Sequence, residues 1–252
     1  MSTQKTAKGY KSWKADRKTR DLVREMAKTG RANIVSGNRL IMYKAPIKLG
    51  EIKALDMPYA TYTLNATAVI TPLNLIRAGS SFFNRIGRRI EMKSLHFKGL
   101  ISPLRTVAAG DYVRVMIVYD SQTNGAPPNI SDILQDTDQA GANSTNSYSS
   151  INLNNRDRFK VLCDYRIVLP SATVTAGVIS NPGFIDPTAV SFDLERFIKL
   201  KGLPTYYKAD SSPAVIGDIA TGGLYLVTYG SIGAGSEGFQ LVASTRLRYN
   251  DN

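Results

Sequence analysis

The residues best suited to chemistry in this sequence are cations gathered near its start. Lysines recur at every third position from residue 5, and further lysines and arginines follow. The ten basic side chains of the first 31 residues are Lys5, Lys8, Lys11, Lys14, Arg17, Lys18, Arg20, Arg24, Lys28 and Arg31. Ammonium and guanidinium groups form charge-assisted hydrogen bonds with phosphates, so this segment predicts contact with a polyanion.

Two aromatic residues lie among these cations. Tyr10 and Trp13 can stack on nucleic-acid bases, or they can pack against the rest of the protein. Trp13 joins the candidate nucleic-acid-binding residues. A solvated charged helix without a ligand is the alternative interpretation of the same segment.

The positive charge is concentrated in this part of the chain. Residues 1–53 hold 14 basic and 4 acidic side chains, whereas residues 54–252 hold 18 and 16. The first part therefore contributes +10 of the net +12, and the second is nearly neutral. This contrast predicts a basic N-terminal arm with a linker over 1–53 and one body domain over 54–252.

A second basic cluster lies further along the chain. Arg85, Arg88 and Arg89 come immediately before a predicted strand. They either line the same surface as the arm and contact phosphates, or they are ordinary solvated charges beside the strand. The pattern favours neither interpretation, and all three are candidate nucleic-acid-binding residues.

The sequence contains few of the motifs that enzymes use for catalysis. A Ser-His-Asp triad would have to use His96, the single histidine, and no GxSxG motif accompanies any serine. Cys163, the single cysteine, alternates with Val161 and Tyr165, which is typical of a small core residue. No GxxxxGK[ST] phosphate loop is present. We expect no catalytic activity and no cofactor.

Metal and membrane binding are not predicted either. Asp132, Asp136 and Asp138 could gather a calcium ion, but their spacing matches no EF-hand loop. No apolar run approaches the roughly 18 residues of a membrane helix, and the charged N-terminus does not resemble a signal peptide.

Strand patterns dominate the body that must position these residues. Strands are expected over 59–70, 88–101, 112–119, 158–169, 190–203, 222–232 and 238–249. In the third of these, apolar residues occupy one face completely and the other largely, which predicts burial on both sides. A phase shift near Lys93–Ser94 predicts a bulge in the second.

The remaining segments are expected to be a helix, a linker and loops. Ser12 and Gly30 bracket a predicted helix over about 13–29. Residues 32–58 read as an irregular linker with a short strand within 33–43, and Ser131 could cap one helical turn. Residues 120–128 and 136–155 are expected to be surface or intersubunit loops. Short strands joined by long loops favour an all-β Greek-key sandwich or jelly roll.

Three segments together resemble a known protein family. They read RRIEMKSLHFKGLI at 88–101, VMIVYDSQTNGAPPNISDIL at 115–134 and NRDRFKVLCD at 155–164. Their order and spacing resemble capsid proteins of small circular single-stranded DNA viruses, the circovirus-like group, and are also similar to coat proteins of satellite necrosis viruses. The resemblance covers roughly residues 59–249, behind a basic arm.

This resemblance implies an eight-stranded jelly-roll β-sandwich with a basic, partly helical N-terminal arm. It further implies self-assembly into a T=1 icosahedral shell of 60 copies and packaging of a single-stranded genome by the arm, with DNA favoured over RNA. The protein would lie in the virion and could enter the host nucleus during assembly. The alternative function is a non-viral, lectin-like binding module with a basic tail.

Overall fold

The computed structural model describes residues 33–36, 39–42, 51–104, 111–135, 145–170, 191–233, 236 and 238–251. The chain divides into two compact units, residues 1–49 and 50–252. In the first unit, β1 (Asn33–Ser36) pairs antiparallel with β2 (Arg39–Met42), which agrees with the expected short strand within 33–43. The helix expected over 13–29 lies outside the described residues.

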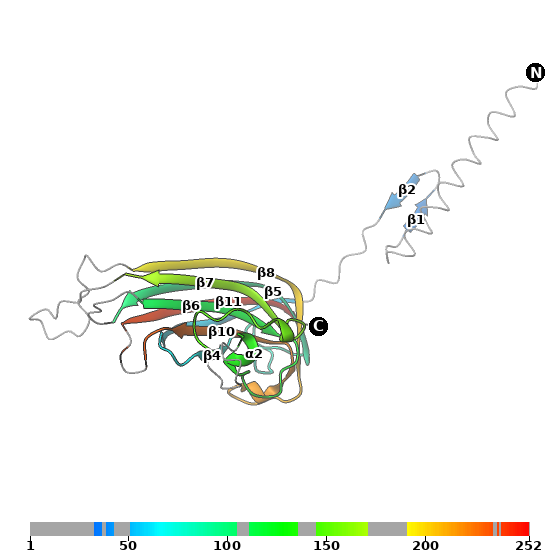
Figure 1. The fold of residues 1–252 in the computed structure, drawn as a ribbon. Helices are drawn as coiled ribbons and strands as arrows, with labels where there is room; N and C mark the ends of the chain where they lie inside the picture. Colours follow the sequence, from blue (N-terminus) through cyan, green and yellow to red (C-terminus); the bar gives the residue numbers. More distant parts are fainter. Residues whose placement is uncertain are drawn as a thin grey trace, which may run out of the picture. The chain divides into compact units, whose positions relative to one another are not determined.

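The second unit is built from two antiparallel sheets (Figure 1). One has the order β4-β10-β6-β7 and the other β3-β11-β5-β8-β9. Their strands are β3 (Glu51–Thr63), β4 (Val69–Pro72), β5 (Arg89–Pro103), β6 (Asp111–Asp120), β7 (Phe159–Leu169), β8 (Phe192–Tyr207), β9 (Ile219–Thr221), β10 (Gly223–Gly230) and β11 (Phe239–Asp251). Short helical turns are α2 (Ile130–Ile133), η1 (Leu153–Asn155) and η2 (Ile216–Asp218).

Pairing among the strands of the second unit, β9 apart, is nested. The outermost strands in the chain, β3 and β11, pair with each other, and inside them β4 pairs with β10. Within those, β5 pairs with β8, and β6 pairs with β7 at the centre. A long antiparallel ribbon that is rolled onto itself into two sheets gives this order, so the body is the expected eight-stranded jelly roll.

Strand β6 shows how sequence alternation sets the packing. All ten of its residues are buried. Val113, Val115 and Ile117 face the other sheet in the main core, while Met116 and Val118 face outward into a smaller cluster. Apolar residues on both faces require cover on both sides, as the sequence predicted.

The cover on the outer side comes from the segment after β6. Ile133 and Leu134 pack on Met116 and Val118 and complete this smaller cluster, which we call the outer cluster. Residues 145–150 lie nearby, because Arg114 of β6 donates to their carbonyl oxygens. The described part of the long loop expected over 136–155 therefore covers the four-stranded sheet.

One expected strand, 59–70, was wrong. It is two strands in different sheets, β3 and β4, separated by a turn at Leu64–Ala68. The Asn65 side chain accepts from the Thr67 N–H at 2.9 Å, and the Asn65 carbonyl accepts from the Gly230 N–H. An Asx turn of this kind reverses the chain even where β-branched residues lie on both sides.

The linker expected over 32–58 was also wrong over its last eight residues, because β3 begins at Glu51. Pro58 suggested a break, but it lies where the β3–β11 register shifts, between Met57 and Ala60. β3 is an edge strand, and a proline is tolerated at a bulge on an edge. The sheet therefore starts before Tyr59.

Bulges interrupt two other strands. The β5–β8 register shifts between Met92 and Ser94, which confirms the bulge expected near Lys93–Ser94. In β7 a shift beside Leu162 places Val161 against the outer cluster, whereas Cys163 packs against the main core. Cys163 is thus half-buried among apolar residues, as expected.

The helical turn was predicted two residues late and with the wrong cap. The N-cap of α2 is Asn129, whose N–H donates to Asp132 at 3.1 Å, and Ser131 lies inside the turn. Asp132 is therefore engaged in capping, while Asp136 and Asp138 lie outside the described residues. Of the helices that the structure describes, none is long and apolar enough to cross a membrane.

Candidate nucleic-acid interface

The candidate residues divide between the two units. The ten cations of the first 31 residues and Trp13 lie outside the described part of the chain. Arg85, Arg88 and Arg89 lie in the body, at and just before the start of β5. These three neighbours have different surroundings.

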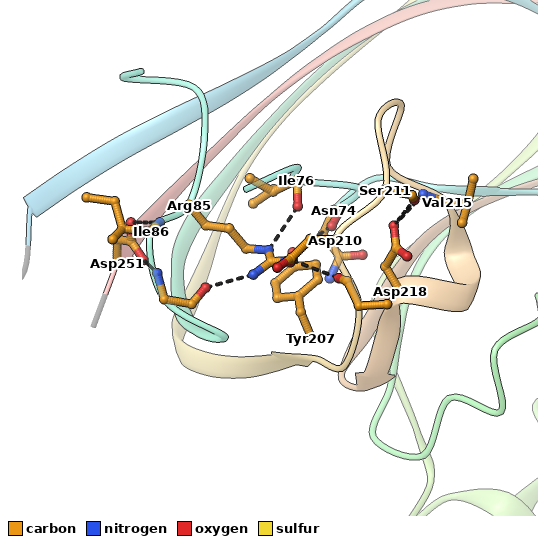
Figure 2. Close-up of polar contacts among 12 residues, drawn as sticks. Asn74, Ile76, Arg85, Ile86, Tyr207, Asp210, Ser211, Val215, Asp218 and Asp251 are labelled. Carbon is orange, nitrogen blue, oxygen red and sulfur yellow. Dashed lines mark hydrogen bonds and ion pairs between the residues drawn. The ribbon is translucent and has the colours of Figure 1, made fainter. Parts of the chain in front are cut away.

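Arg85 is buried inside the body and is held by protein groups (Figure 2). Its guanidinium donates to the carbonyl oxygens of Ile76, Gly87 and Ala209 at 3.1, 2.8 and 3.0 Å, and it pairs with the Asp210 carboxylate. The group also lies 4.0 Å from the centre of the Tyr207 ring. Arg85 therefore ties the connector before β5 to the segment after β8.

Other groups around Arg85 are equally fixed. Burial raises the pKa of Tyr207, so its hydroxyl stays protonated and donates to the Asn74 carbonyl at 2.8 Å. The Asp218 carboxylate accepts from the Ser211 hydroxyl and from the Val215 N–H, and these two hydrogen bonds lower the pKa of Asp218 (Figure 2). Hydrogen bonds among buried groups therefore fix the connector and the segment after β8 at this end of the sandwich.

A buried ion pair holds the connector from its other side. Lys53 of β3 lies 2.9 Å from Asp251 of β11 and also donates to the Asn84 carbonyl. Asp251 accepts from the N–H groups of Ile86 and Gly87 at 2.6 and 3.1 Å. Burial alone would raise the pKa of Asp251, but these donors outweigh it and lower the pKa. The connector is thus held immediately before Arg88.

Arg88 and Arg89 are exposed, unlike Arg85. Arg89 pairs with Glu91 at 3.0 Å and lies 5.7 Å from the centre of the Tyr206 ring. Among the described residues, Arg88 forms no ion pair. Of the second basic cluster, these two arginines are therefore the ones accessible to a ligand.

The outer face of the five-stranded sheet is open, and it carries functional groups that the sequence did not single out. Arg248 of β11, Ser94 of β5 and Lys199 of β8 lie side by side in one cross-strand row. The adjacent row holds Arg246, His96 and Phe197. Arg248 and Lys199 are exposed and form no ion pair within the described part of the chain.

A trough of about 590 Å³ crosses these two rows; we call it the aromatic trough. Its lining includes Phe82, Phe83, Phe197, His96, Arg246 and Arg248. Strand alternation places both arginines on the outward face of β11, opposite the buried Leu247 and Tyr249. The two connector phenylalanines gave no such signal, because a long-range fold brings them beside the sheet.

The charges in the trough are mostly paired with each other. Arg246 makes two 2.7 Å hydrogen bonds with Asp56, which lower the pKa of Asp56. His96 lies 2.8 Å from Glu195, and Lys98 lies 3.4 Å from the same carboxylate. The hydrogen bond with His96, followed by that with Lys98, lowers the pKa of Glu195. His96 therefore occupies a surface ion cluster.

Cys163 does not have the surroundings of a nucleophile. Burial raises the pKa of its thiol above the ordinary value. A reactive cysteine needs the thiolate, which burial disfavours. The residue acts in packing.

The body thus has the nested jelly roll found in viral capsid and lectin domains, joined to a strongly basic segment. The model of the Geminivirus coat protein/nuclear export factor BR1 family matches residues 2–252. The chain therefore belongs to this family and is a viral capsid protein of the virion. The expected capsid protein of a single-stranded DNA virus is confirmed, although the matching family is that of geminiviruses and not the circovirus-like group.

Two solved structures are similar to this chain at low identity. One is Desmodium yellow mottle tymovirus, with 11% identity over 85% of this chain and 96% of that one and a TM-score of 0.33. The other is infectious bursal disease virus Gx strain, with 10% identity over 88% of this chain and 36% of that one and a TM-score of 0.24. A search of curated proteins finds no match. The assignment rests on the family model.

Proposed function

We propose that this capsid protein assembles into a T=1 icosahedral shell of 60 copies and packages a single-stranded DNA genome through its basic arm. Membership of the coat protein family over residues 2–252 is the observation that carries the proposal. Sixty copies of 27.6 kDa make a shell of about 1.7 MDa. Mass measurement and negative-stain microscopy of the purified chain test this: particles of another symmetry, or a species near the monomer mass, would rule out the T=1 shell.

The charge distribution supports packaging by the arm. Sixty arms of +10 bring about 600 positive charges into one shell, the same order as the phosphates of a kilobase of single strand. The body contributes only +2 per copy. Lysine side chains bind phosphates and do not read base edges, so this binding is independent of sequence.

Within the arm, the phosphate-binding residues are the ten cations of the first 31 residues, with Trp13 stacking on a base. Arg88 and Arg89 extend the set onto the body. Arg85 is left out, because its guanidinium is taken up by protein carbonyls and Asp210.

Removal of residues 1–31 tests the role of the arm. It deletes ten basic and three acidic side chains, or +7 of the +12. Since the logarithm of the binding constant falls by about 0.7 per neutralised phosphate per decade of salt, the salt dependence should flatten steeply. If the slope of binding against salt is unchanged, the arm does not neutralise phosphates and has another function, such as docking a neighbouring copy.

The nature of the cargo and the place of assembly are tested separately. Nucleic acid extracted from particles should be digested by DNase and resist RNase. The family also includes a nuclear export factor, which supports a nuclear step during assembly. A fluorescent fusion that stays out of the nucleus of infected cells would contradict that step.

A further inference from the structure

The aromatic trough on the five-stranded sheet combines two kinds of group that seldom meet on an open surface. Phe82, Phe83 and Phe197 expose 52%, 53% and 54% of their area. A cluster of exposed phenylalanines on a soluble domain marks a surface with a partner. They surround a hollow of about 590 Å³, which is in the range of small-ligand sites.

The charged side chains beside these rings leave a positive excess, which favours an anionic ligand. Arg246, His96 and Lys98 each have a carboxylate partner in Asp56 or Glu195. Arg248 and Lys199 have no ion-pair partner among the residues that the structure describes. Arg248 and Lys199 lie on the two strands that flank β5, each opposite Ser94. Two strand spacings separate them, so the Cα atoms of Arg248 and Lys199 are roughly 10 Å apart. The net excess charge of the two rows is therefore positive.

We propose that the aromatic trough binds single-stranded nucleic acid through an unpaired base. The base stacks among Phe82, Phe83 and Phe197, while Arg248 and Lys199 bind the adjoining phosphates. Every base has a π-face, so such stacking tolerates any sequence. Bases in a duplex are already stacked and cannot enter, and the site therefore selects single strands, which the charge of the arm alone does not do.

This inference rests on the proposed packaging function and adds the group that is recognised. A surface contact between copies is the competing occupant. Two observations favour the nucleic acid. Arg248 and Lys199 have no ion-pair partner within the described ranges, and the half-exposed rings lie around a hollow and not on a flat patch.

The test compares two labelled probes on the full chain at equal salt: a 12-mer of thymidylate and a 12-mer of abasic residues with the same phosphates. The intact protein should bind the thymidylate strand about tenfold more tightly, because stacking contributes beyond charge. In a Trp13→Ala background, which removes the ring proposed to stack in the arm, Phe197→Ala and the double change Phe82→Ala with Phe83→Ala should lose this preference while binding the abasic strand as before. Circular dichroism checks that the variants remain folded, which their exposure favours.

Two controls define the site. Tyr148→Ala removes a comparably exposed ring, 64% exposed, from the cover of the other sheet, and the preference should survive. Arg248→Gln with Lys199→Gln should weaken both probes equally and reduce the salt slope by about 1.4, given two phosphates.

The outcomes separate the two proposals. If neither probe binds the intact chain, packaging itself fails. If both bind equally well, or if Phe197→Ala keeps the preference, the trough does not bind a base and the arm proposal stands. If Phe197→Ala keeps the preference but prevents assembly, the trough is a contact between copies, which overturns the inference.

Discussion

On the four-stranded sheet, the outward side of β6 carries Arg114, Met116 and Val118, all buried beneath the segment that follows the strand. On the five-stranded sheet, the outward side of β11 carries Arg246 and Arg248, both exposed. The two strands share the same alternation but not the same outward residues. An apolar outward face has to be covered, whereas a charged one is stable in water.

The covered and the open sheet face each carry an arginine–aspartate pair, and the two pairs differ in burial. Arg114 makes 2.9 and 2.8 Å hydrogen bonds with Asp164 and donates to the carbonyls of Ser147 and Ser149. Arg246 makes two hydrogen bonds of similar length with Asp56 but remains 61% exposed. The first pair fastens a loop to a sheet, and the second only neutralises charge on a surface that is open to partners.

Loss of Arg114 should have the largest effect. Arg114→Ala leaves the carbonyls of Ser147 and Ser149 without this donor and leaves Asp164 with Arg166 as its remaining partner, and we expect the free energy of unfolding to fall by about 3 kcal/mol. Urea unfolding followed by circular dichroism measures this. Tryptophan fluorescence would not, because the single tryptophan, Trp13, lies in the arm. Protein concentration must be matched, since assembly adds to apparent stability. A loss below about 1 kcal/mol would show that the cover holds without this arginine.

Acid should weaken the covered side next. Burial raises the pKa of Asp164, but hydrogen bonds from Arg114 and Arg166 outweigh this and bring the pKa below its ordinary value. A carboxylate with a lowered folded pKa contributes stability above its unfolded pKa, about 4, and loses it as pH falls through the folded value. The free energy of unfolding should be flat from about pH 7 to pH 5 and decline below about pH 4. Asp164→Asn should reduce that decline, and an identical acid profile would contradict the assignment.

A single hydrogen bond of the cover should contribute less. The Tyr229 hydroxyl of β10 donates to the Thr145 carbonyl at 2.5 Å. Tyr229→Phe removes it without changing the ring, so we expect a loss of about 1 kcal/mol. Hydrogen exchange of residues 145–150 should rise more than that of β6. A uniform rise across the sheet would mean that the cover does not open separately.

The smallest effect is expected on the open face. Arg246→Ala breaks an ion pair that water already screens, so the urea midpoint should shift far less than in Arg114→Ala. The same urea experiment serves as the matched control for Arg114→Ala. Equal losses in the two variants would erase the distinction between the covered and the open face.

The strands of the body were predictable from the sequence because their alternation is strong. The buried side of β11, from Phe239 to Tyr249, and the bulge near Lys93 both followed from the spacing of apolar residues. The chain reversal at Asn65 and the bulge at Pro58 were missed, because local propensity does not show which sheet a segment joins.

The candidate site was less predictable for the same physical reason. Arg85 looks like Arg88 in the sequence, yet its partners lie 124 and 125 residues away, at Ala209 and Asp210. The aromatic trough likewise joins Phe82 and Phe197, which only the fold brings to one surface. Charge composition identified the basic arm, but tertiary contacts decide which arginines of the body remain accessible.

Packaging by the arm is tested most directly by counting protected nucleotides. In the variant, the ten basic residues of the first 31 are changed to glutamine, which keeps the length of the chain and turns this segment from +7 to −3. Particles are purified, treated with nuclease, and the remaining nucleotides are counted per copy of protein. We expect shells that form but protect far less nucleic acid than those of the unchanged protein. Equal protection in the two preparations would contradict it.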